Sequence, residues 1–173
     1  MEFRKMRRSR QELSFADTEQ ILKVCPTGIL GLLGENGYPY TVPLNYVYLD
    51  GKIYFHCAQS GHKLDAMQSC EKVSFCVVER DRVIPHAFAT NYRSAIAFGR
   101  ARLVPDAQAQ TKRRALEALN QKYAPDFERE GEREILSGWS GVQIVEIQID
   151  HLTGKEALKS VQEKEILLDT QEP

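Results

Sequence analysis

The spacing of apolar residues changes along the chain, and each change marks a different kind of element. Apolar and polar residues alternate over residues 145–150, which is the period of a strand buried on one face. Leu116, Leu119 and Tyr123 instead repeat at the i, i+3, i+7 spacing of a helix face, within a helix expected over residues 106–123. The chain is therefore expected to combine strands with helices.

Turn signals divide the first part of the chain into short strands. The apolar run Thr27–Leu33 precedes an Asn-Gly pair at residues 36–37. The tyrosine- and valine-rich residues 38–49 precede an Asp-Gly pair at residues 50–51, and a further strand is expected over residues 52–58. Such pairs favour the positive φ angles of a tight hairpin turn, so three consecutive antiparallel strands are predicted.

Helices and further strands follow the same logic. Short helices are expected over residues 17–24 and 62–70, and β-type runs occupy residues 73–78 and 92–104. Gly99 inside the longer run indicates a bulge or a close backbone approach. Strands and helices do not alternate regularly, which argues against a doubly wound sheet. The predicted class is mainly β (α+β): a small barrel or sandwich of about six antiparallel strands with two to four flanking helices.

Composition supports one ordinary globular domain. The 173 residues are 42% hydrophobic and 27% charged, so one domain is expected over residues 1–173, with a basic arm at residues 1–12 and a tail at residues 155–173. The 23 Lys and Arg residues nearly balance the 24 Asp and Glu residues, which argues against a nucleic-acid partner. Three basic residues at 112–114 are interpreted as a solvated helix face.

The basic arm does not begin an export signal. A signal peptide needs an apolar segment after its basic residues, whereas the polar residues 11–20 follow here. The longest uncharged apolar run, residues 24–34, contains Pro26 and three glycines, and it is shorter than the roughly 20 residues of a membrane helix. A soluble, cytoplasmic protein without a membrane partner is expected.

The four cysteines show no metal-binding spacing. No C-x-x-C pair occurs among Cys25, Cys57, Cys70 and Cys76, and no His residues accompany them at the spacing of metal ligands. We therefore expect no metal site, and reduced, mostly buried thiols.

Residues with unusual chemistry concentrate in one stretch. They are Val42, Pro43, Leu44 and Asn45 on one strand, His56 and Cys57 at the end of the next, and Gly61, His62 and Lys63 at a helix start. A helix N-terminus presents unpaired N–H groups to an anion. Gly61 lets the anion approach the backbone, and Lys63 adds a full charge. The stretch therefore predicts an anion-binding ledge.

Backbone geometry limits how these residues share a surface. His56 and Cys57 are adjacent on a strand, so their side chains are expected on opposite faces of the sheet. Pro43 lacks the N–H of a strand ladder, which favours a sheet edge or a margin that faces a ligand.

The chain resembles the FMN-binding split-barrel superfamily of pyridoxamine 5'-phosphate oxidase-like proteins, and within it the 5-nitroimidazole resistance (Nim-type) branch. The matching segments are YPYTVPLN at residues 38–45, LDGKIYFH at residues 49–56, GHKLD at residues 61–65 and SAIAFGRA at residues 94–101. The resemblance spans residues 10–154, and it implies a Greek-key split β-barrel.

The resemblance also implies FMN as cofactor and a set of site residues. By position, Val42, Pro43, Leu44 and Asn45 would lie along the isoalloxazine ring, with Asn45 at its polar edge. His56 and Cys57 would border the ribityl chain and phosphate, and His62 and Lys63 would bind the phosphate. Ser94 stands where the oxidases place a longer amide that reaches the flavin. Proteins of this kind are homodimers with the flavin at the subunit interface, so a second copy would complete each site.

The chain departs from the oxidases proper near its C-terminus. They carry a Trp-x-Gly closing motif and then an arginine-rich tail that holds the substrate phosphate. Residues 139–141 look like the start of that region, but residues 152–155 read LTGK at the position of the motif, and no arginine follows. The resemblance therefore implies an FMN-dependent reductase of a small acceptor such as a nitroaromatic, rather than a pyridoxamine phosphate oxidase.

His56 is the candidate catalytic residue, because an imidazole titrates near neutral pH and can donate a proton. Two alternatives stay open: a haem-binding protein on the same barrel, with His56 or His62 as axial ligand, and a non-enzymatic flavin carrier. His86 and His151 have no motif around them and are interpreted as surface or loop residues.

Overall fold

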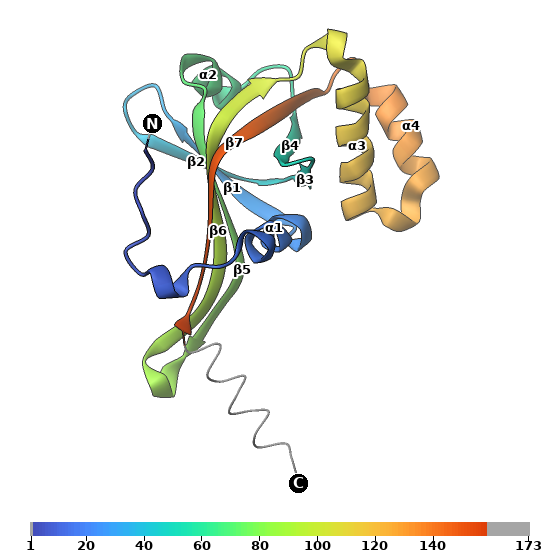
Figure 1. Ribbon diagram of the computed structural model, residues 1–173. Coiled ribbons are helices and arrows are strands. Elements are labelled where there is room, and N and C mark those ends of the chain that lie inside the picture. Colours follow the sequence, from blue (N-terminus) through green and yellow to red (C-terminus); the bar gives the residue numbers. More distant parts are fainter. Residues whose placement is uncertain (1, 159–173) are drawn as a thin grey trace.

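The computed structural model describes residues 2–158, whose strands form one seven-stranded antiparallel sheet (Figure 1). The strands are β1 (Thr27–Leu33), β2 (Pro39–Asn45), β3 (Val47–Leu49), β4 (Lys52–Cys57), β5 (Lys72–Ile84), β6 (Ala89–Leu103) and β7 (Gln143–Glu156). Their order across the sheet is β2-β1-β5-β6-β7-β4-β3. The predicted antiparallel α+β class is confirmed.

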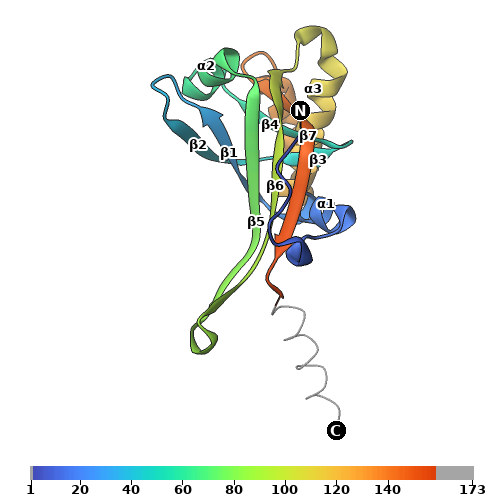
Figure 2. The same cartoon turned by 60° about the vertical axis from the view of Figure 1, so that its left-hand side comes forward.

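Four α-helices and four 3-10 turns connect the strands. The helices are α1 (Phe15–Val24), α2 (His62–Ser69), α3 (Ala109–Tyr123) and α4 (Glu128–Gly138). The short turns are η1 (Ser9–Gln11), η2 (Pro85–Ala87), η3 (Asp106–Gln108) and η4 (Pro125–Phe127). Helix α2 lies at one end of the barrel, α3 and α4 pair at its side, and the β5–β6 hairpin projects from the opposite end (Figures 1 and 2).

The sheet closes into a barrel at Tyr46. Residues 38–49 were expected to form one strand, but they divide into β2 and β3, which lie at opposite ends of the strand order. Because Tyr46 alone joins the two strands, the sheet must curl until its edges approach each other. The Tyr46 side chain is fully buried, and its ring meets Phe75 edge-on at 4.9 Å between centroids. This aromatic contact anchors Tyr46 in the core at the point where β2 and β3 separate.

Alternation along the strands separates two apolar clusters. The larger cluster fills the barrel and includes Leu30, Phe55 and Phe75. The smaller cluster includes Tyr54 and Leu119, where α3 covers the sheet. Strand β4 therefore directs successive side chains alternately into the barrel and toward α3.

The first helix begins earlier than predicted. The expected start was residue 17, but Ser14 caps the helix, so that α1 begins at Phe15. The Ser14 Oγ accepts a hydrogen bond from the Asp17 N–H at 3.1 Å. The side chain that satisfies a free N–H determines where the helix starts, and the sequence reading missed that role of Ser14.

The β5–β6 hairpin is longer than predicted, because pairing continues through polar residues that break the apolar pattern. Runs at residues 73–78 and 92–104 were expected, whereas β5 and β6 pair as far as Ile84 and Ala89. The predicted bulge at Gly99 is confirmed by a shift in the β6–β7 register. A Cβ atom there would lie 2.3 Å from the carbonyl oxygen of Gln148, so the close approach requires glycine.

Two charged residues expected in solvent are buried. Lys112 was assigned to a solvated helix face, but its Nζ donates to the Trp139 carbonyl oxygen at 2.7 Å, and its side chain is buried. Glu146 stands at a polar position of the alternating strand β7, yet it accepts hydrogen bonds from Lys52 and Tyr54 at 3.0 and 2.8 Å. Burial raises the pKa of Glu146, but these donors and Arg102 outweigh it and hold the pKa below its ordinary value. The hydrogen bond of Lys112 joins α3 to the end of α4, and the bonds of Glu146 join β7 to β4.

The predicted arm and tail both meet the barrel. Glu12, at the end of the arm, forms an isolated antiparallel β-bridge with Lys155. Strand β7 continues to Glu156, inside the region predicted as tail. Residues 159–173 of that tail lie outside the described residues. Over residues 2–158, no helix combines the length and apolarity needed to cross a membrane.

Candidate functional site

The N-terminus of α2 is open, because no side chain in the described part of the chain caps it. Gly61 occupies the N-cap position with φ +135°, and no side chain within residues 2–158 bonds the first helical N–H groups. The N–H groups of Leu64 and Asp65 reach the Gly61 carbonyl oxygen, which leaves those of His62 and Lys63 without an acceptor within residues 2–158. A Cβ atom on Gly61 would meet nothing within 4 Å. This geometry fits an anionic group such as a phosphate.

Basic and aromatic side chains surround that helix start. The His62 ring stacks on Tyr40 of β2, with centroids 4.1 Å apart and planes at 16°. Burial raises the pKa of the Cys57 thiol, while the nearby Lys63 ammonium acts in the opposite direction. The structure thus brings Lys63 near Cys57. His62 lines a cavity of about 710 Å³ between α2 and the β1–β2 hairpin, together with Tyr40, Glu35 and Asp65.

The predicted residues of β2 divide between two faces. Strand β2 is an edge strand, as Pro43 predicted. Leu44 packs against the barrel core, and Val42 shares its face, whereas Pro43 and Asn45 are exposed on the outer face. Only alternate residues of the set can therefore meet one planar ligand on one side of the strand.

Asn45 shares its hydrogen-bond acceptor with Tyr123, for which the sequence predicted only a place on a helix face. Its Nδ2 donates to the Pro26 carbonyl oxygen at 3.0 Å. The Tyr123 hydroxyl, at the end of α3, donates toward the same oxygen at 2.7 Å and accepts from the Tyr46 N–H at 2.9 Å. A helix-face pattern gave no signal for this polar role of Tyr123.

His56 lies on the other side of β4 from Cys57, as strand alternation predicted. Its imidazole lines a cavity of about 540 Å³ between β4, α3 and α4, which we call the helix-side cavity. Apolar residues such as Leu119 and Ile135 form most of its wall, and Glu130 and Glu134 supply carboxylates. His56 is therefore separated from the α2 start within one chain.

Ser94 belongs to an exposed, largely apolar outer face of the sheet. Cross-strand pairing places Pro43, Ile29, Cys76, Ile96 and Thr153 in one row across five strands. Ile29 and Ile96 are 40% and 38% exposed, and Ser94 lies on the same face of β6. This face is a candidate contact surface.

A further cavity opens on that outer face, where no sequence motif predicted one. It measures about 470 Å³ and its lining includes Phe3, Leu33, Tyr40, Lys72, Ser74 and Phe98; we call it the outer-face cavity. Tyr40 and its neighbours Pro39 and Thr41 also line the cavity beside α2, so the two adjoin across β2. A groove therefore runs from the α2 start onto the sheet.

His151 was interpreted as a surface or loop residue, but it lies within β7. Its ring stacks on Phe3 of the N-terminal arm, with centroids 4.5 Å apart and planes at 7°. Phe98 lies 5.7 Å from the same Phe3 ring. The contact joins the two ends of the described chain, which is why no local motif revealed it.

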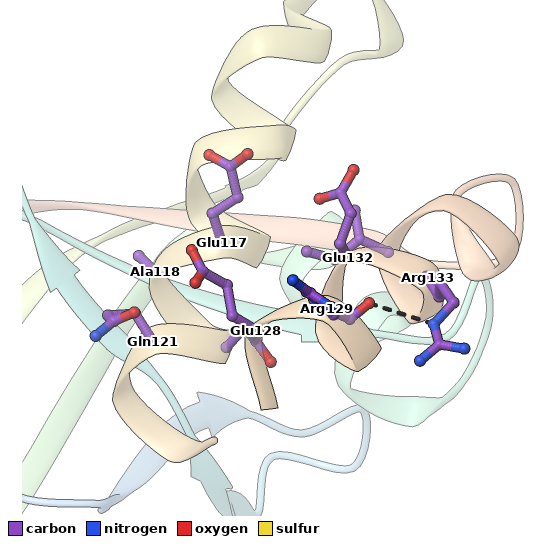
Figure 3. Close-up of a pocket in the computed structure, with 9 residues that line it drawn as sticks. Glu117, Ala118, Gln121, Glu128, Arg129, Glu132 and Arg133 are labelled. Atoms are coloured by element: carbon purple, nitrogen blue, oxygen red, sulfur yellow. Dashed lines mark hydrogen bonds between the residues drawn. The ribbon is translucent and has the colours of Figure 1, made fainter. Parts of the chain in front are cut away.

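A further cavity, of about 810 Å³, separates α3 from α4 on the side shown in Figure 3. Two of its carboxylates, Glu117 and Glu132, accept hydrogen bonds from the neighbouring Arg113, and Arg133 donates to the Arg129 carbonyl oxygen. None of the predicted site residues lines it. In addition, no group of three metal-ligating side chains occurs within residues 2–158.

Solved structures share this fold. A protein from Bacteroides thetaiotaomicron described as a candidate 5-nitroimidazole antibiotic resistance protein is 22% identical, with a TM-score of 0.67 over 84% of this chain and 86% of that one. An FAD-binding protein from Mesorhizobium loti is also 22% identical, with a TM-score of 0.63 over 85% and 97%. An FAD- and haem-binding protein from Mycobacterium smegmatis is 20% identical, with a TM-score of 0.69 over 86% and 73%.

Sequence comparison gives a family. No curated protein matches the chain. The profile of the pyridoxamine 5'-phosphate oxidase family matches residues 15–156, a span that runs from α1 to the end of β7 and contains the α2 start and both faces of the sheet. Since this span is most of the chain, the protein belongs to the pyridoxamine 5'-phosphate oxidase family.

Proposed function

We propose that the protein is an FMN-dependent oxidoreductase that reduces a small acceptor such as a nitroaromatic. The open α2 start carries the proposal: Gly61 leaves its N–H groups free, and Lys63 adds a positive charge beside them. Such a group suits a phosphate monoester, which distinguishes FMN from riboflavin. The FAD-binding proteins of similar fold support a flavin in general.

The groove beyond α2 suits the remainder of the cofactor. Tyr40 and Thr41 line both adjoining cavities, and the sheet beyond them exposes Pro43 and Asn45. When bound, a flavin would supply hydride and electron transfer. The protein would hold the phosphate at His62 and Lys63, border the chain with Cys57, and meet the polar edge of the ring with Asn45. Val42 and Leu44 would support the strand from inside the barrel.

A second copy of the chain would complete the site. The outer face exposes Ile29, Ile96 and Phe98, each about 40% accessible, and apolar sheet faces of this kind are commonly covered by a symmetric partner. Ser94 lies on this face, where a flavin between two subunits would reach it. We propose a homodimer with the flavin at this interface.

The acceptor is inferred from the family comparison and from the tail. Residues 155–173 contain no arginine for a substrate phosphate. The similar structure from Bacteroides is described as a candidate 5-nitroimidazole resistance protein, which supports a nitro compound as acceptor. His56 stays the proposed proton donor, and that role requires the acceptor to reach the helix-side cavity.

Haem is the second candidate, because one protein of similar fold binds both FAD and haem and His56 faces a mainly apolar cavity. The charges there oppose it. Glu130 and Glu134 line that cavity and no Lys or Arg does, whereas haem propionates need cationic partners. The α2 start, in contrast, carries the ammonium of Lys63 and the N–H groups of a helix end that no side chain within residues 2–158 caps. Charge therefore favours FMN over haem.

The absorbance spectrum of the purified protein, with cofactor titrations, tests this proposal. We expect flavin bands, about one FMN per chain, and tighter binding of FMN than of riboflavin because of the phosphate contacts. Equal affinity for FMN and riboflavin would remove the phosphate assignment. A Soret band would favour the haem alternative. Bound FMN without turnover of any donor and acceptor pair would favour the flavin-carrier alternative.

A further inference from the structure

The outer-face cavity has walls suited to a flat ring. Phe3 and Phe98 form one side, with their centroids 5.7 Å apart, and Leu33 and Tyr40 come from β1 and β2. The Phe3 ring is held in turn by the parallel His151 ring behind it. Aromatic walls favour stacked or edge-on contacts with another planar ring.

The polar groups of this cavity are donors without partners. Lys72, Ser74 and Thr41 line it, and none of their side chains has a hydrogen bond or ion pair within the described part of the chain. Gly31 leaves room for the Ser74 hydroxyl, since a Cβ there would lie 2.5 Å from that oxygen. Unpaired donors on an apolar surface favour a ligand that carries acceptor oxygens.

Lys72 and Asp150 are the charged residues in the lining of the cavity, and only Asp150 has an ion-pair partner within residues 2–158. Asp150 is the carboxylate in its lining, and Arg100 occupies both of its oxygens, at 2.9 and 3.2 Å. Lys72 pairs with Arg100 across the strands and has no carboxylate of its own within residues 2–158. The arm that carries Phe3 brings Arg4 and Lys5, both exposed. An anion is therefore attracted here more than a cation.

From these three observations we infer that the outer-face cavity binds a planar aromatic anion, with Phe3 as a movable wall and Lys72 as its charge partner. His151 is a positioning residue, because it holds the Phe3 ring without lining the cavity. This inference deepens the proposed function, on which it rests for its link to catalysis: it assigns anionic aromatic acceptors, such as nitrobenzoates, to the outer face, where His56 of the same chain would not be their proton donor.

The test compares two probes of similar shape, 4-nitrobenzoate and 4-nitrobenzyl alcohol. Binding is measured by calorimetry and by shifts in NMR spectra, on the full-length protein both with and without FMN. We expect wild-type protein to prefer the anion by about threefold to tenfold, the range for an exposed or partly exposed charge pair. Equal affinities in wild-type protein would overturn the inference.

Two variants separate charge from stacking. Lys72→Gln should abolish the preference for the anion and leave the neutral probe unchanged. Phe3→Ala should weaken both probes by about twofold to tenfold, through loss of an aromatic contact. Lys23→Gln on α1 and Phe88→Ala at the hairpin tip are matched controls, because both residues are exposed and neither lines the cavity. Wild-type binding by both Lys72→Gln and Phe3→Ala would overturn the inference.

Cofactor binding is scored separately by FMN absorbance. Selective binding of nitrobenzoate to a chain that takes up no FMN would support the cavity assignment while refuting the proposed function. If FMN binds and nitrobenzoate is reduced, but the preference survives Lys72→Gln, the proposed function stands and the cavity assignment fails.

Discussion

The outer-face cavity and the helix-side cavity are similar in size and differ in charge. They measure about 470 and 540 Å³, and both have largely apolar walls. One contains the ammonium of Lys72 and the carboxylate of Asp150, which Arg100 pairs, and the other contains Glu130 and Glu134 with the imidazole of His56. Shape alone would admit a flat ligand to either. Charge assigns the anion to the outer face, which also adjoins the α2 start.

The largest expected effect concerns the outer face as a subunit interface. Ile96→Glu would place an unpaired charge in an apolar contact, and we expect the dimer to dissociate about 100-fold to 1000-fold more readily. Ile96 is already 38% exposed in one chain, so the monomer should fold. Analytical ultracentrifugation measures the change, and Leu136→Glu on the exposed face of α4 is the control. A wild-type protein that is monomeric at micromolar concentration with flavin bound would refute the dimer.

The second prediction tests the groove that leads to the outer face. Lys63→Ala should weaken FMN by roughly 10-fold to 150-fold, through loss of a charge-assisted contact with the phosphate. The same change should leave riboflavin affinity nearly unaltered. Fluorescence titration of both ligands gives the two constants, and Lys23→Ala serves as the matched surface change. An effect below about twofold on FMN would place the Lys63 charge in solvent.

The third prediction concerns α3, which forms one wall of the helix-side cavity. The Lys122 Nζ is buried, has no hydrogen-bond partner within residues 2–158 and lies 4.1 Å from the centre of the Tyr46 ring. Burial lowers its pKa to about 8 from an ordinary 10.5. Between about pH 8 and pH 10.5, the folded protein therefore binds fewer protons than the unfolded chain. The free energy of unfolding rises with pH through this window because of Lys122, and this group causes no such rise below the window.

Lys122→Met should remove that cost. We expect the variant to be more stable at pH 7 by about 1 to 2 kcal/mol, allowing for partial exposure of the side chain, and to lack this rise above pH 8. Urea unfolding at pH 7, 8 and 9 measures both changes. A variant that is less stable at pH 7 would mean that the contact of the ammonium with Tyr46 outweighs its desolvation.

The smallest expected effect on binding is at the helix-side cavity. His56→Ala should change FMN affinity by less than about twofold, because His56 lies on the opposite face of β4 from Cys57 and lines a cavity apart from α2. The rate of acceptor reduction at saturating FMN gives the second measurement. A fall of about 10²-fold to 10⁴-fold in this rate would identify His56 as the proton donor. A loss of FMN instead would erase the distinction between the two cavities.

Features with local causes could be predicted from the sequence. Pro43 indicated an edge strand because it lacks a backbone N–H. Gly61 indicated an open helix start because it has no side chain. Each of these is a property of a single residue. The roles of Tyr123 and His151 depend on partners far along the chain: Tyr123 bonds Tyr46, and His151 meets Phe3. Apolar periodicity reports which face is buried, and it carries no information on which distant residue lies opposite.

The burial of Lys112 teaches the same lesson about charge. A run of basic residues on a helix is ordinarily solvated, and its neighbours Arg113 and Arg114 do form exposed or partly exposed ion pairs. Lys112 differs because the Trp139 carbonyl oxygen faces it from beyond α4. That carbonyl is a backbone group, so no residue type predicts it, and the Trp139 ring, whose centre lies 4.7 Å from the Lys112 Nζ, is 27 residues away in sequence.

The pairing of β4 with β7 governs how the barrel can assemble. Strands β1 and β2, β3 and β4, and β5 and β6 pair with neighbours in sequence, whereas Tyr54 and Glu146 meet across 92 residues. Closing so long a loop costs entropy before any contact compensates for it, and such topologies fold slowly. The α3–α4 pair lies inside this loop. Changes to its length should therefore alter the folding rate more than the equilibrium stability of the barrel.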